Sequence, residues 1–184
     1  MKELSLNVLD VAENSYKAGA KQVCVSLQET GNRLTLTIQD DGCGMTPDIL
    51  KVVTDPFYTT RTTRKVGLGL PLLRMAAEQT GGGMTVKSVS EKENPASHGT
   101  TVTAVFYTDH LDFTPLGDIV STVTTLIQGH PTVDLLFTHE TETQSVRLDT
   151  AELREVLGDV SLAEYEVIHW IEDCLKEQYE AINK

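Results

Sequence analysis

The sequence predicts an α+β protein, because apolar residues recur with helical spacing in some segments and alternate as in strands in others. Neighbouring strand-like segments are joined by short polar turns, which favours antiparallel hairpins. One glycine-rich stretch directly follows a strand, and another directly precedes a helix. With 184 residues, of which 40% are hydrophobic and 23% charged, the chain is long enough to bury a real core.

The first half of the chain is expected to form three helices and four strands. Gly19 ends the first helix, and Thr46–Pro47 is a typical helix start, with the hydroxyl as N-cap and proline at the first helical position. Three consecutive glycines, 81–83, end the third helix. The polar segment 55–65 is expected to be a mobile loop. The expected helices cover residues 3–18, 47–53 and 70–79, and the expected strands cover 23–28, 34–39, 84–90 and 100–107.

The second half is expected to contain a helix, a hairpin and two further helices. Asp149 can cap the short helix, and Ser161 with Glu164 has the spacing of a capping box that would open a long terminal helix. The apolar stripe of that last helix repeats every three to four residues, which is more typical of core packing than of a cofactor site. The expected helix covers residues 116–128, and the expected strands cover 133–138 and 145–148.

Charge divides the chain into two units. Residues 1–110 hold 11 Lys and Arg against 12 Asp and Glu, whereas residues 111–184 hold 4 against 15. This shift predicts one domain over residues 1–109 and an acidic α+β extension over 110–184. The acidic half is either a solvated surface, which is the commoner meaning of acidic helices, or a docking face for a protein partner with basic residues.

Composition also bounds the partners and the compartment. A net charge of −12 disfavours non-specific binding to nucleic acid and to anionic membrane surfaces. The three cysteines have unrelated spacings, so neither a disulfide framework nor a zinc site is indicated. The sequence has no apolar segment with the length of a signal peptide or a membrane span. We therefore expect a cytoplasmic protein, and the sequence does not indicate its oligomeric state.

The first motif is a polar stripe on the first helix. Asp10, Asn14 and Lys17 are spaced i, i+4 and i+7, so they share one helix face. An amide oxygen together with water suits Mg²⁺, a lysine suits phosphate, and a carboxylate can polarise a water molecule. Taken alone, this pattern is also that of a plain amphipathic helix.

The second motif is the glycine turn that follows the second strand. Asp40, Gly42, Gly44 and Met45 come at the end of an alternating apolar segment. The glycines allow the backbone to approach a flat ligand, and a fixed carboxylate can accept a hydrogen bond from the exocyclic amine of adenine. Asp-Gly pairs are equally common in ordinary turns.

The third motif joins a polar segment to a helix start. Residues 55–61 read Asp-Pro-Phe-Tyr-Thr-Thr-Arg, and residues 67–70 read Gly-Leu-Gly-Leu at the beginning of a helix. Free N–H groups at a helix N-terminus favour a bound phosphate. The glycine pattern is neither the dinucleotide fingerprint nor a P-loop.

In this order, the three motifs resemble the nucleotide site of the GHKL (Bergerat-fold) ATPases, which include gyrase, a heat-shock chaperone, MutL and the histidine kinases. Gly99–Thr101 is similar to the final glycine-threonine strand of that superfamily, so the resemblance covers residues 4–107. It implies a two-layer sandwich, in which a mixed, mostly antiparallel sheet is covered on one face by helices. The chain as a whole resembles small stand-alone bacterial ATP-binding proteins.

The resemblance also implies a role for each matching residue. Asp10 would be catalytic and orient the attacking water, Asn14 would hold Mg²⁺, and Lys17 and Arg61 would contact the phosphates of ATP. Asp40 would accept from the adenine amino group, and Phe57 would belong to a lid over the nucleotide. The full set implied to bind the cofactor is Asn14, Lys17, Asp40, Gly42, Gly44, Met45, Phe57, Thr60, Arg61, Gly67, Leu68, Gly69, Leu70 and Thr100.

The sequence departs from the family pattern in two ways. Hydrolysing members normally carry Glu where this chain has Asp10, whose side chain is shorter by one methylene, ~1.5 Å. Glu13 points about 100° away on the helix and is expected to be a surface residue. In addition, none of the five histidines has the context of a phospho-accepting histidine, so ordinary histidine autokinase activity is not expected.

Three functions are compatible with these residues. The first is a nucleotide-controlled regulatory switch with weak or partner-dependent Mg²⁺-dependent ATP hydrolysis. The second is a protein kinase that acts in trans on serine or histidine of a partner, as anti-sigma-factor kinases do. The third is a protein that binds ATP only as a ligand, with Asp10 too short to support hydrolysis. In each case, the acidic half is the expected surface for a protein partner.

Overall fold

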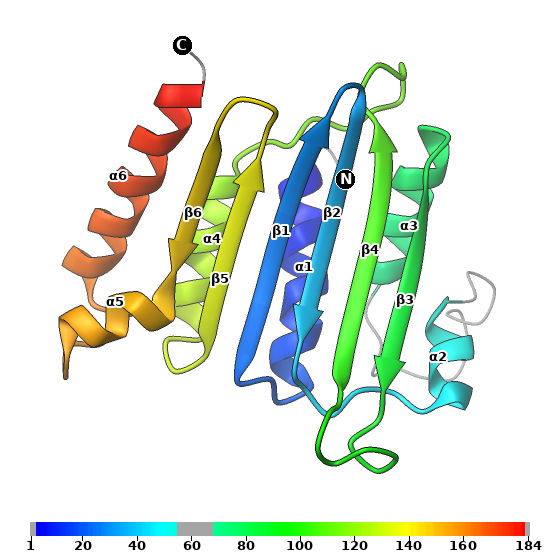
Figure 1. Cartoon of the computed structure of the whole chain (residues 1–184), viewed down its shortest axis with the longest axis horizontal. Coiled ribbons are helices and arrows are strands. Elements are labelled where there is room, and N and C mark those ends of the chain that lie inside the picture. The colour runs from blue at the N-terminus through cyan, green and yellow to red at the C-terminus, as the bar shows by residue number, and fades with distance from the viewer. Residues whose placement is uncertain (1–2, 55–67, 183–184) are drawn as a thin grey trace.

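A six-stranded mixed sheet forms the centre of the computed structural model, which describes residues 3–54 and 68–182 (Figure 1). Its strand order is β3-β4-β2-β1-β5-β6, and only the β1–β5 pair is parallel. The sheet is therefore mostly antiparallel, as expected. The expected loop at 55–65 lies outside the described residues. The strands are β1 (Gln22–Thr30), β2 (Arg33–Asp40), β3 (Gly83–Val89), β4 (Gly99–Tyr107), β5 (Asp134–Glu140) and β6 (Ser145–Asp149).

Helices cover one face of this sheet, and two more lie at its β6 end (Figure 1). Helices α1, α3 and α4 cover the face, α2 lies beside α3 near the β3 end, and α6 packs against α4 and β6. This two-layer α+β arrangement confirms the expected fold class. The helices are α1 (Leu4–Lys17), α2 (Pro47–Thr54), α3 (Gly69–Gln79), α4 (Ile119–Gly129), α5 (Thr150–Leu157) and α6 (Tyr165–Ile182).

The core lies between the sheet and these helices. Alternate strand residues point into it, such as Leu34, Leu36 and Ile38 of β2, while their neighbours along the strand remain partly exposed. The apolar side chains of both halves of the sequence join in one cluster, which extends from Leu4 of α1 to Leu175 of α6. The segment after residue 110 thus contributes two strands to the same sheet and side chains to the same core.

The segment before α4 is tied to the beginning of α1. The first backbone N–H groups of α1, at Leu4 and Ser5, donate to the carbonyl oxygens of Pro115 and Leu116, both at 2.9 Å. Helix α4 therefore begins at Ile119 and not at the expected residue 116, because the preceding carbonyls serve α1. Asp118 caps α4 by accepting from Ser121, and these hydrogen bonds lower the pKa of Asp118.

Helix α6 also begins later than expected. The hydroxyl of Ser161 accepts from the N–H of Ala163, and the Ser161 carbonyl accepts from Glu164, which together form a turn. The α-helix begins only at Tyr165, so the expected capping box is wrong: Glu164 precedes the helix. The local spacing was correct for a box, but the hydrogen bonds of the turn use the same groups.

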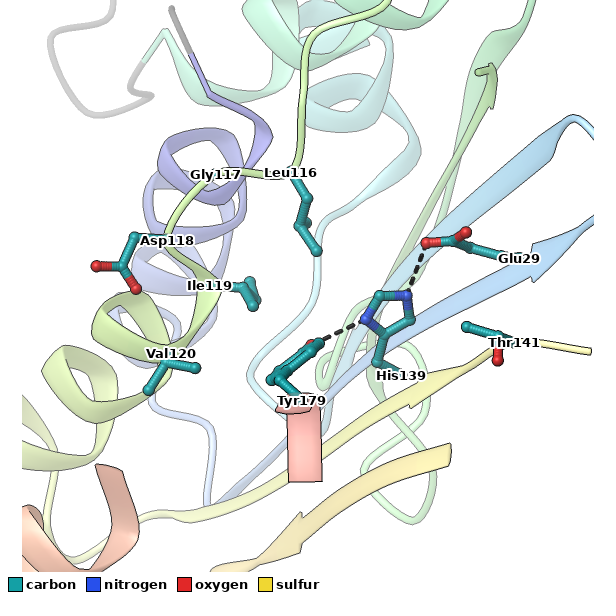
Figure 2. A pocket seen from close by; sticks show the side chains of 9 residues that line it. All are labelled: Glu29, Leu116, Gly117, Asp118, Ile119, Val120, His139, Thr141 and Tyr179. Carbon is teal, nitrogen blue, oxygen red and sulfur yellow. Dashed lines mark hydrogen bonds and ion pairs between the residues drawn. The ribbon is translucent and has the colours of Figure 1, made fainter. Parts of the chain in front are cut away.

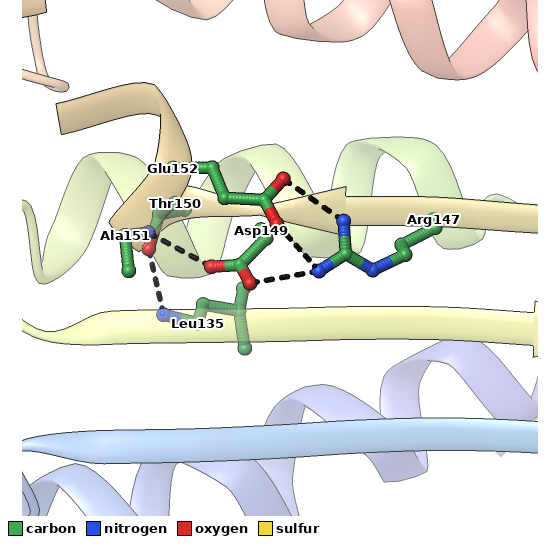
Figure 3. Close-up of polar contacts among 6 residues, drawn as sticks. All are labelled: Leu135, Arg147, Asp149, Thr150, Ala151 and Glu152. Carbon is green, nitrogen blue, oxygen red and sulfur yellow. Dashed lines mark hydrogen bonds and ion pairs between the residues drawn. The ribbon is translucent and has the colours of Figure 1, made fainter. Parts of the chain in front are cut away.

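The β6 edge of the sheet is closed by side chains. Gln178 of α6 accepts from the backbone N–H of Arg147 at 2.9 Å and donates to its carbonyl at 3.3 Å. Figure 3 shows the Arg147 guanidinium between the carboxylates of Asp149 and Glu152, while Asp149 caps α5, as expected, by accepting from Ala151. The edge strand thus has polar partners from α6 and is poorly suited to pair with another strand.

Candidate functional site

The candidate site is a cavity of about 240 Å³ between α1, the turn after β2, and α3. Its lining brings together seven of the residues that the sequence singled out, from four separate segments. Thr100 and Val102 of β4 form the wall on the sheet side. The seven residues are Asn14, Lys17, Asp40, Gly44, Met45, Leu70 and Thr100.

Asp40 is held in one orientation at the cavity wall. Its Oδ1 accepts from the backbone N–H of Gly42 at 2.9 Å and of Thr100 at 3.3 Å. Its Oδ2 accepts from the hydroxyl of Ser15 on α1 at 2.6 Å. Asp41, the adjacent carboxylate, turns away and accepts from the backbone of Lys21 and Gln22. Only one of the two neighbouring aspartates therefore lines the cavity.

The glycines of this turn are required by close packing. A Cβ atom on Gly44, whose φ is +63°, would lie 1.8 Å from the carbonyl oxygen of Val89. A Cβ on Gly42 would lie 2.9 Å from that of Ala18 at the end of α1. Gly42 is buried behind the cavity wall and does not line the cavity. The two glycines thus press the turn against α1 and β3 and leave room for a ligand on the other side.

Helix α1 presents its predicted polar stripe along this cleft. Asn14 and Lys17 line the cavity, whereas Asp10, one turn earlier, is exposed and lies outside the lining. Asp10 instead faces the beginning of α3, where a Cβ on Gly69 would lie 3.1 Å from the Cβ of Asp10. The stripe therefore extends from the cavity toward the N-terminus of α3.

The N-terminus of α3 receives no side-chain cap from the residues that the structure describes. Leu68 precedes the helix with an exposed side chain, Gly69 packs on α1, and Leu70 is buried against the cavity. N–H groups at the N-terminus of a helix favour a negatively charged ligand. Four residues of the predicted set lie outside the described residues: Phe57, Thr60, Arg61 and Gly67.

Three supporting residues were missed by the sequence reasoning. Ser15 donates to Asp40, Ser88 accepts from the N–H of Met45 at 2.8 Å, and Ser88 also shares a 2.8 Å hydrogen bond with the hydroxyl of Thr100. His98 donates from Nδ1 to the Gly42 carbonyl at 2.6 Å, because a carbonyl oxygen only accepts. Ser15 had a recognisable signal: it continues the buried stripe of Leu4, Val8 and Val11, where a hydroxyl needs a partner.

Glu13 is paired on the other side of α1. Its carboxylate lies 2.9 Å from Nε2 of His130, whose ring stacks on Tyr16 with centroids 3.8 Å apart. Burial, with the nearby charge of Glu13, raises the pKa of Tyr16. Glu13 is thus engaged with the loop after α4, so the expectation of a simple surface residue was incomplete, and it is directed away from the candidate site.

A second cavity, of about 370 Å³, lies near the end of β1 (Figure 2). It contains a buried histidine, His139, between Glu29 at 2.9 Å from Nε2 and the Tyr179 hydroxyl at 2.8 Å from Nδ1. In the neutral imidazole, Nε2 donates to the carboxylate, and Nδ1 accepts from the phenol. Burial and the charge of Glu29 raise the pKa of Tyr179. This chain of contacts joins β1, β5 and α6.

The family comparison decides what kind of site this is. A family model described as histidine kinase-, DNA gyrase B- and HSP90-like ATPase matches residues 1–110. The chain belongs to this ATPase family. Membership supports ATP binding by the matched residues, which contain the whole candidate site.

Curated relatives resemble the same part of the chain. The sensor histidine kinase ZraS of Salmonella typhimurium is 34% identical over 88 residues, which are 46% of this chain and 19% of that protein. The sensor protein SrrB of Staphylococcus aureus is 33% identical over 93 residues, 48% of this chain and 16% of its own length. The chain thus spans at most about a fifth of these relatives.

Solved structures resemble a larger part of the fold. The N-terminal domain of a DNA repair protein matches 81% of this chain and 53% of its own, at a TM-score of 0.56 and 18% identity. The Aquifex aeolicus MutL ATPase domain complexed with ADP matches 85% of this chain and 69% of its own chain, at a TM-score of 0.53 and 16% identity. Both cover more of the chain than the family model does, and they support the two-layer α+β fold.

Two searches of the described residues gave negative results. Within residues 3–54 and 68–182, no helix is long and apolar enough to cross a membrane. In the same part of the chain, no three His, Cys, Asp or Glu side chains group as a metal site would require.

Proposed function

We propose that this protein binds ATP with Mg²⁺, hydrolyses it slowly or only with a partner, and uses the nucleotide as a regulatory switch. The observation that carries this proposal is the fixed carboxylate of Asp40 at the wall of a cavity that Asn14 and Lys17 also line. Family membership supports ATP as the ligand.

In this proposal, each segment that lines the cavity contacts a different part of the nucleotide. The adenine amino group would donate to Asp40, whose oxygens are oriented by Ser15 and Gly42. Apolar side chains of Met45 and Leu70 would cover the faces of the base. Thr100 would assist the adenine contact, either directly or through water.

The triphosphate would extend along α1 toward α3. Lys17 would supply positive charge, and the N-terminus of α3 would supply N–H groups. Asn14 fits Mg²⁺, a hard cation that prefers oxygen ligands and keeps several waters, so one amide oxygen together with phosphate oxygens suffices. The metal would screen phosphate charge. Arg61 and the lid residues Phe57, Thr60 and Gly67 are proposed to complete the site.

Asp10 is proposed to orient the attacking water. A general base has to approach its proton within about 3 Å, and the aspartate side chain is ~1.5 Å shorter than the glutamate of hydrolysing relatives. Slow turnover follows unless the site closes further. The packing of Gly69 against Asp10 supports this role, because it brings Asp10 close to the N-terminus of α3, where the phosphates are proposed to bind.

The acidic half is proposed to transmit the state of the nucleotide to a protein partner in the cytoplasm. Helix α1 carries the proposed nucleotide residues, and its first N–H groups bond to Pro115 and Leu116 at the beginning of that half. Helix α4 packs on α1, and α6 packs on α4. A shift of α1 would therefore reach α6 through two helix contacts.

The second candidate is a kinase that acts in trans on a partner. Its support is the 34% identity with a segment of the sensor histidine kinase ZraS. Such a kinase would bind ATP through the same residues but would transfer the γ-phosphate to serine or histidine of another protein.

A time course with Mg²⁺ and ATP labelled at the γ-phosphate tests the proposal. We expect saturable ATP binding and slow release of free phosphate, both lost in Asp40→Ala. Asp41→Ala is the matched control, because Asp41 faces away from the cavity. Binding with no phosphate release would leave the transfer or ligand-only functions, and no ATP binding would overturn the proposal.

A further inference from the structure

The surface farthest from the candidate site carries an apolar groove. It lies between α5 and α6, at the β6 end of the sheet, whereas the nucleotide cavity lies among α1, β2, β4 and α3 (Figure 1). The groove encloses about 380 Å³. Its lining consists of five apolar side chains and one carboxylate: Leu153, Val156, Leu157, Val167, Trp170 and Glu166.

Several of these side chains are unusually exposed. Val156 is 85% exposed and Trp170 is 54% exposed, although large apolar side chains are usually buried. Within the described residues, the large exposed apolar side chains number eleven, and four of them fall between residues 156 and 170. Contiguous exposed apolar surface of this kind is typical of protein interaction sites. The other two members of the group are Val160 and Tyr165.

Carboxylates are frequent in the segment that forms the groove. Residues 150–173 contain seven Asp and Glu and a single basic residue, Arg154. Arg154 is already engaged with Asp134 at 2.8 Å and with the carbonyl oxygens of Pro131 and Val133. Its charge is thus directed at the loop before β5. Three of the carboxylates have ion-pair partners, because Glu152 pairs with Arg147, Glu172 with Lys176 and Asp173 with His169. Within the described residues the other four have none, so the helices that form the groove keep a negative charge. The seven acidic residues are Glu152, Glu155, Asp159, Glu164, Glu166, Glu172 and Asp173.

The lining argues against a small-molecule ligand. Small-molecule sites combine apolar walls with a few inward polar groups that orient the ligand, whereas the one polar liner here is the exposed Glu166 at the rim. Strand addition is also disfavoured nearby, because Gln178 occupies the backbone groups of Arg147 on β6. A groove between two helices with apolar walls and charged rims matches the surfaces that bind amphipathic helices.

We propose that the α5–α6 groove binds a basic amphipathic helix of a partner protein. Apolar residues on one face of that helix would enter between Val156 and Trp170, and its Lys and Arg residues would face the surrounding carboxylates. This inference deepens the proposed function, on which it rests for its role, because it names the surface and the chemical class of the partner. The binding itself does not require ATP.

Trp170 provides a direct test, because it is the only tryptophan of the chain. The probe is a helical peptide of leucine and lysine, about 18 residues or five turns long, with leucines on one face. With the full-length chain, we expect a saturable blue shift of tryptophan emission that weakens as salt rises. A peptide of the same composition with its leucines scattered around the helix, and one with glutamate for lysine, should bind at least about tenfold more weakly.

Substitutions at the groove locate the binding. Val156→Ser removes an apolar contact from an exposed position, and Glu166→Lys reverses a rim charge. Each should weaken binding of the leucine-lysine peptide by about tenfold without unfolding the chain. The matched controls are Leu111→Ser, at a side chain that is 97% exposed, and Glu78→Lys on α3. Both should bind like the unmodified chain.

Three results would overturn the inference. The first is the absence of saturable peptide binding, and the second is an equal loss of peptide affinity in the groove variants and the control variants. The third is a concentration-dependent dimer that Val156→Ser abolishes, which would show a second copy of the chain in the groove. Asp40→Ala separates this proposal from the previous one, because it should lose ATP and keep the peptide. If ATP binding fails in the unmodified chain while peptide binding persists, only the proposed function is overturned.

Discussion

The hydroxyl of Ser15 donates to Oδ2 of Asp40 at 2.6 Å, and this contact joins the last turn of α1 to the end of β2. The opposite carboxylate oxygen accepts from Gly42 and Thr100. A carboxylate with three donors loses little orientational freedom when a ligand binds, so its acceptor geometry is present in advance. Ser15 is therefore a positioning residue for the proposed adenine contact.

We expect Ser15→Ala to weaken ATP binding by about threefold to tenfold, or roughly 1 kcal/mol, because Asp40 keeps two of its three donors but is less firmly oriented. Calorimetric titration with ATP measures this change. Ser5→Ala is the matched control, since Ser5 is a buried serine on the same helix that does not contact Asp40. If Ser15→Ala and Ser5→Ala both bind ATP as tightly as the unmodified chain, the Ser15–Asp40 contact does not orient the site.

Variants of Asp10 test whether the short reach of this proposed catalytic carboxylate limits the rate of hydrolysis. Asp10→Glu adds ~1.5 Å of reach and should raise the rate of phosphate release. Asp10→Asn should lower that rate by about a hundredfold or more, while ATP affinity changes little. Release of labelled phosphate, measured beside ATP binding for each variant, tests this. Turnover that stays at zero with glutamate, with binding intact, would favour the ligand-only function.

Local patterns predicted most elements of this fold, because each depends on neighbours in sequence. The hairpin of β1 and β2 followed from alternation across the turn at Gly31, and α1 followed from its apolar stripe and Gly19. The parallel pairing of β1 with β5 joins residues over a hundred positions apart, and nothing local indicates it. The start of α4 was displaced for the same reason, since Leu116 bonds to Ser5 in α1.

The residues of the candidate site also fall into those that local motifs predicted and those that depend on the fold. Family spacing identified Asp40 and Asn14, because each belongs to a short motif. The residues that hold the turn after Asp40 in place come from elsewhere: Ser88 of β3 bonds to Met45, and His98, in the loop before β4, bonds to Gly42. Such supporting contacts depend on which strands become neighbours. A single sequence contains no direct signal for them.

Removal of residues 110–184 tests whether the first 109 residues fold alone. We expect the truncated chain to aggregate, because β1 would lose its whole parallel pairing with β5 and expose an unpaired strand edge. Helix α1 would also lose the carbonyls of Pro115 and Leu116. Size-exclusion chromatography and ATP titration provide the measurement, and co-expression of residues 110–184 as a separate chain should restore solubility. A soluble, ATP-binding fragment would instead establish an independent domain.

Tyr179 anchors α6 through His139, which is only 4% exposed (Figure 2). Tyr179→Phe leaves Nδ1 of that imidazole buried without its donor, so we expect a loss of roughly 1–3 kcal/mol in the free energy of unfolding. Urea denaturation at pH 7 measures this loss. Tyr165→Phe is the matched control: Tyr165 is 79% exposed, and its substitution should change stability by less than about 0.5 kcal/mol.

The same residue gives stability a dependence on alkaline pH. Burial raises the pKa of Tyr179, so the unfolded chain releases this proton first, at its ordinary value near 10. The stability that the protonated phenol contributes is complete below pH 10 and is lost as pH rises from there toward the folded-state pKa. Tyr16, whose pKa is also raised, adds a slope of the same sign. Above pH 10, the free energy of unfolding of Tyr179→Phe should therefore fall less steeply with pH than that of the unmodified chain. Urea denaturation at several pH values measures both slopes, and equal slopes would contradict the burial of this phenol.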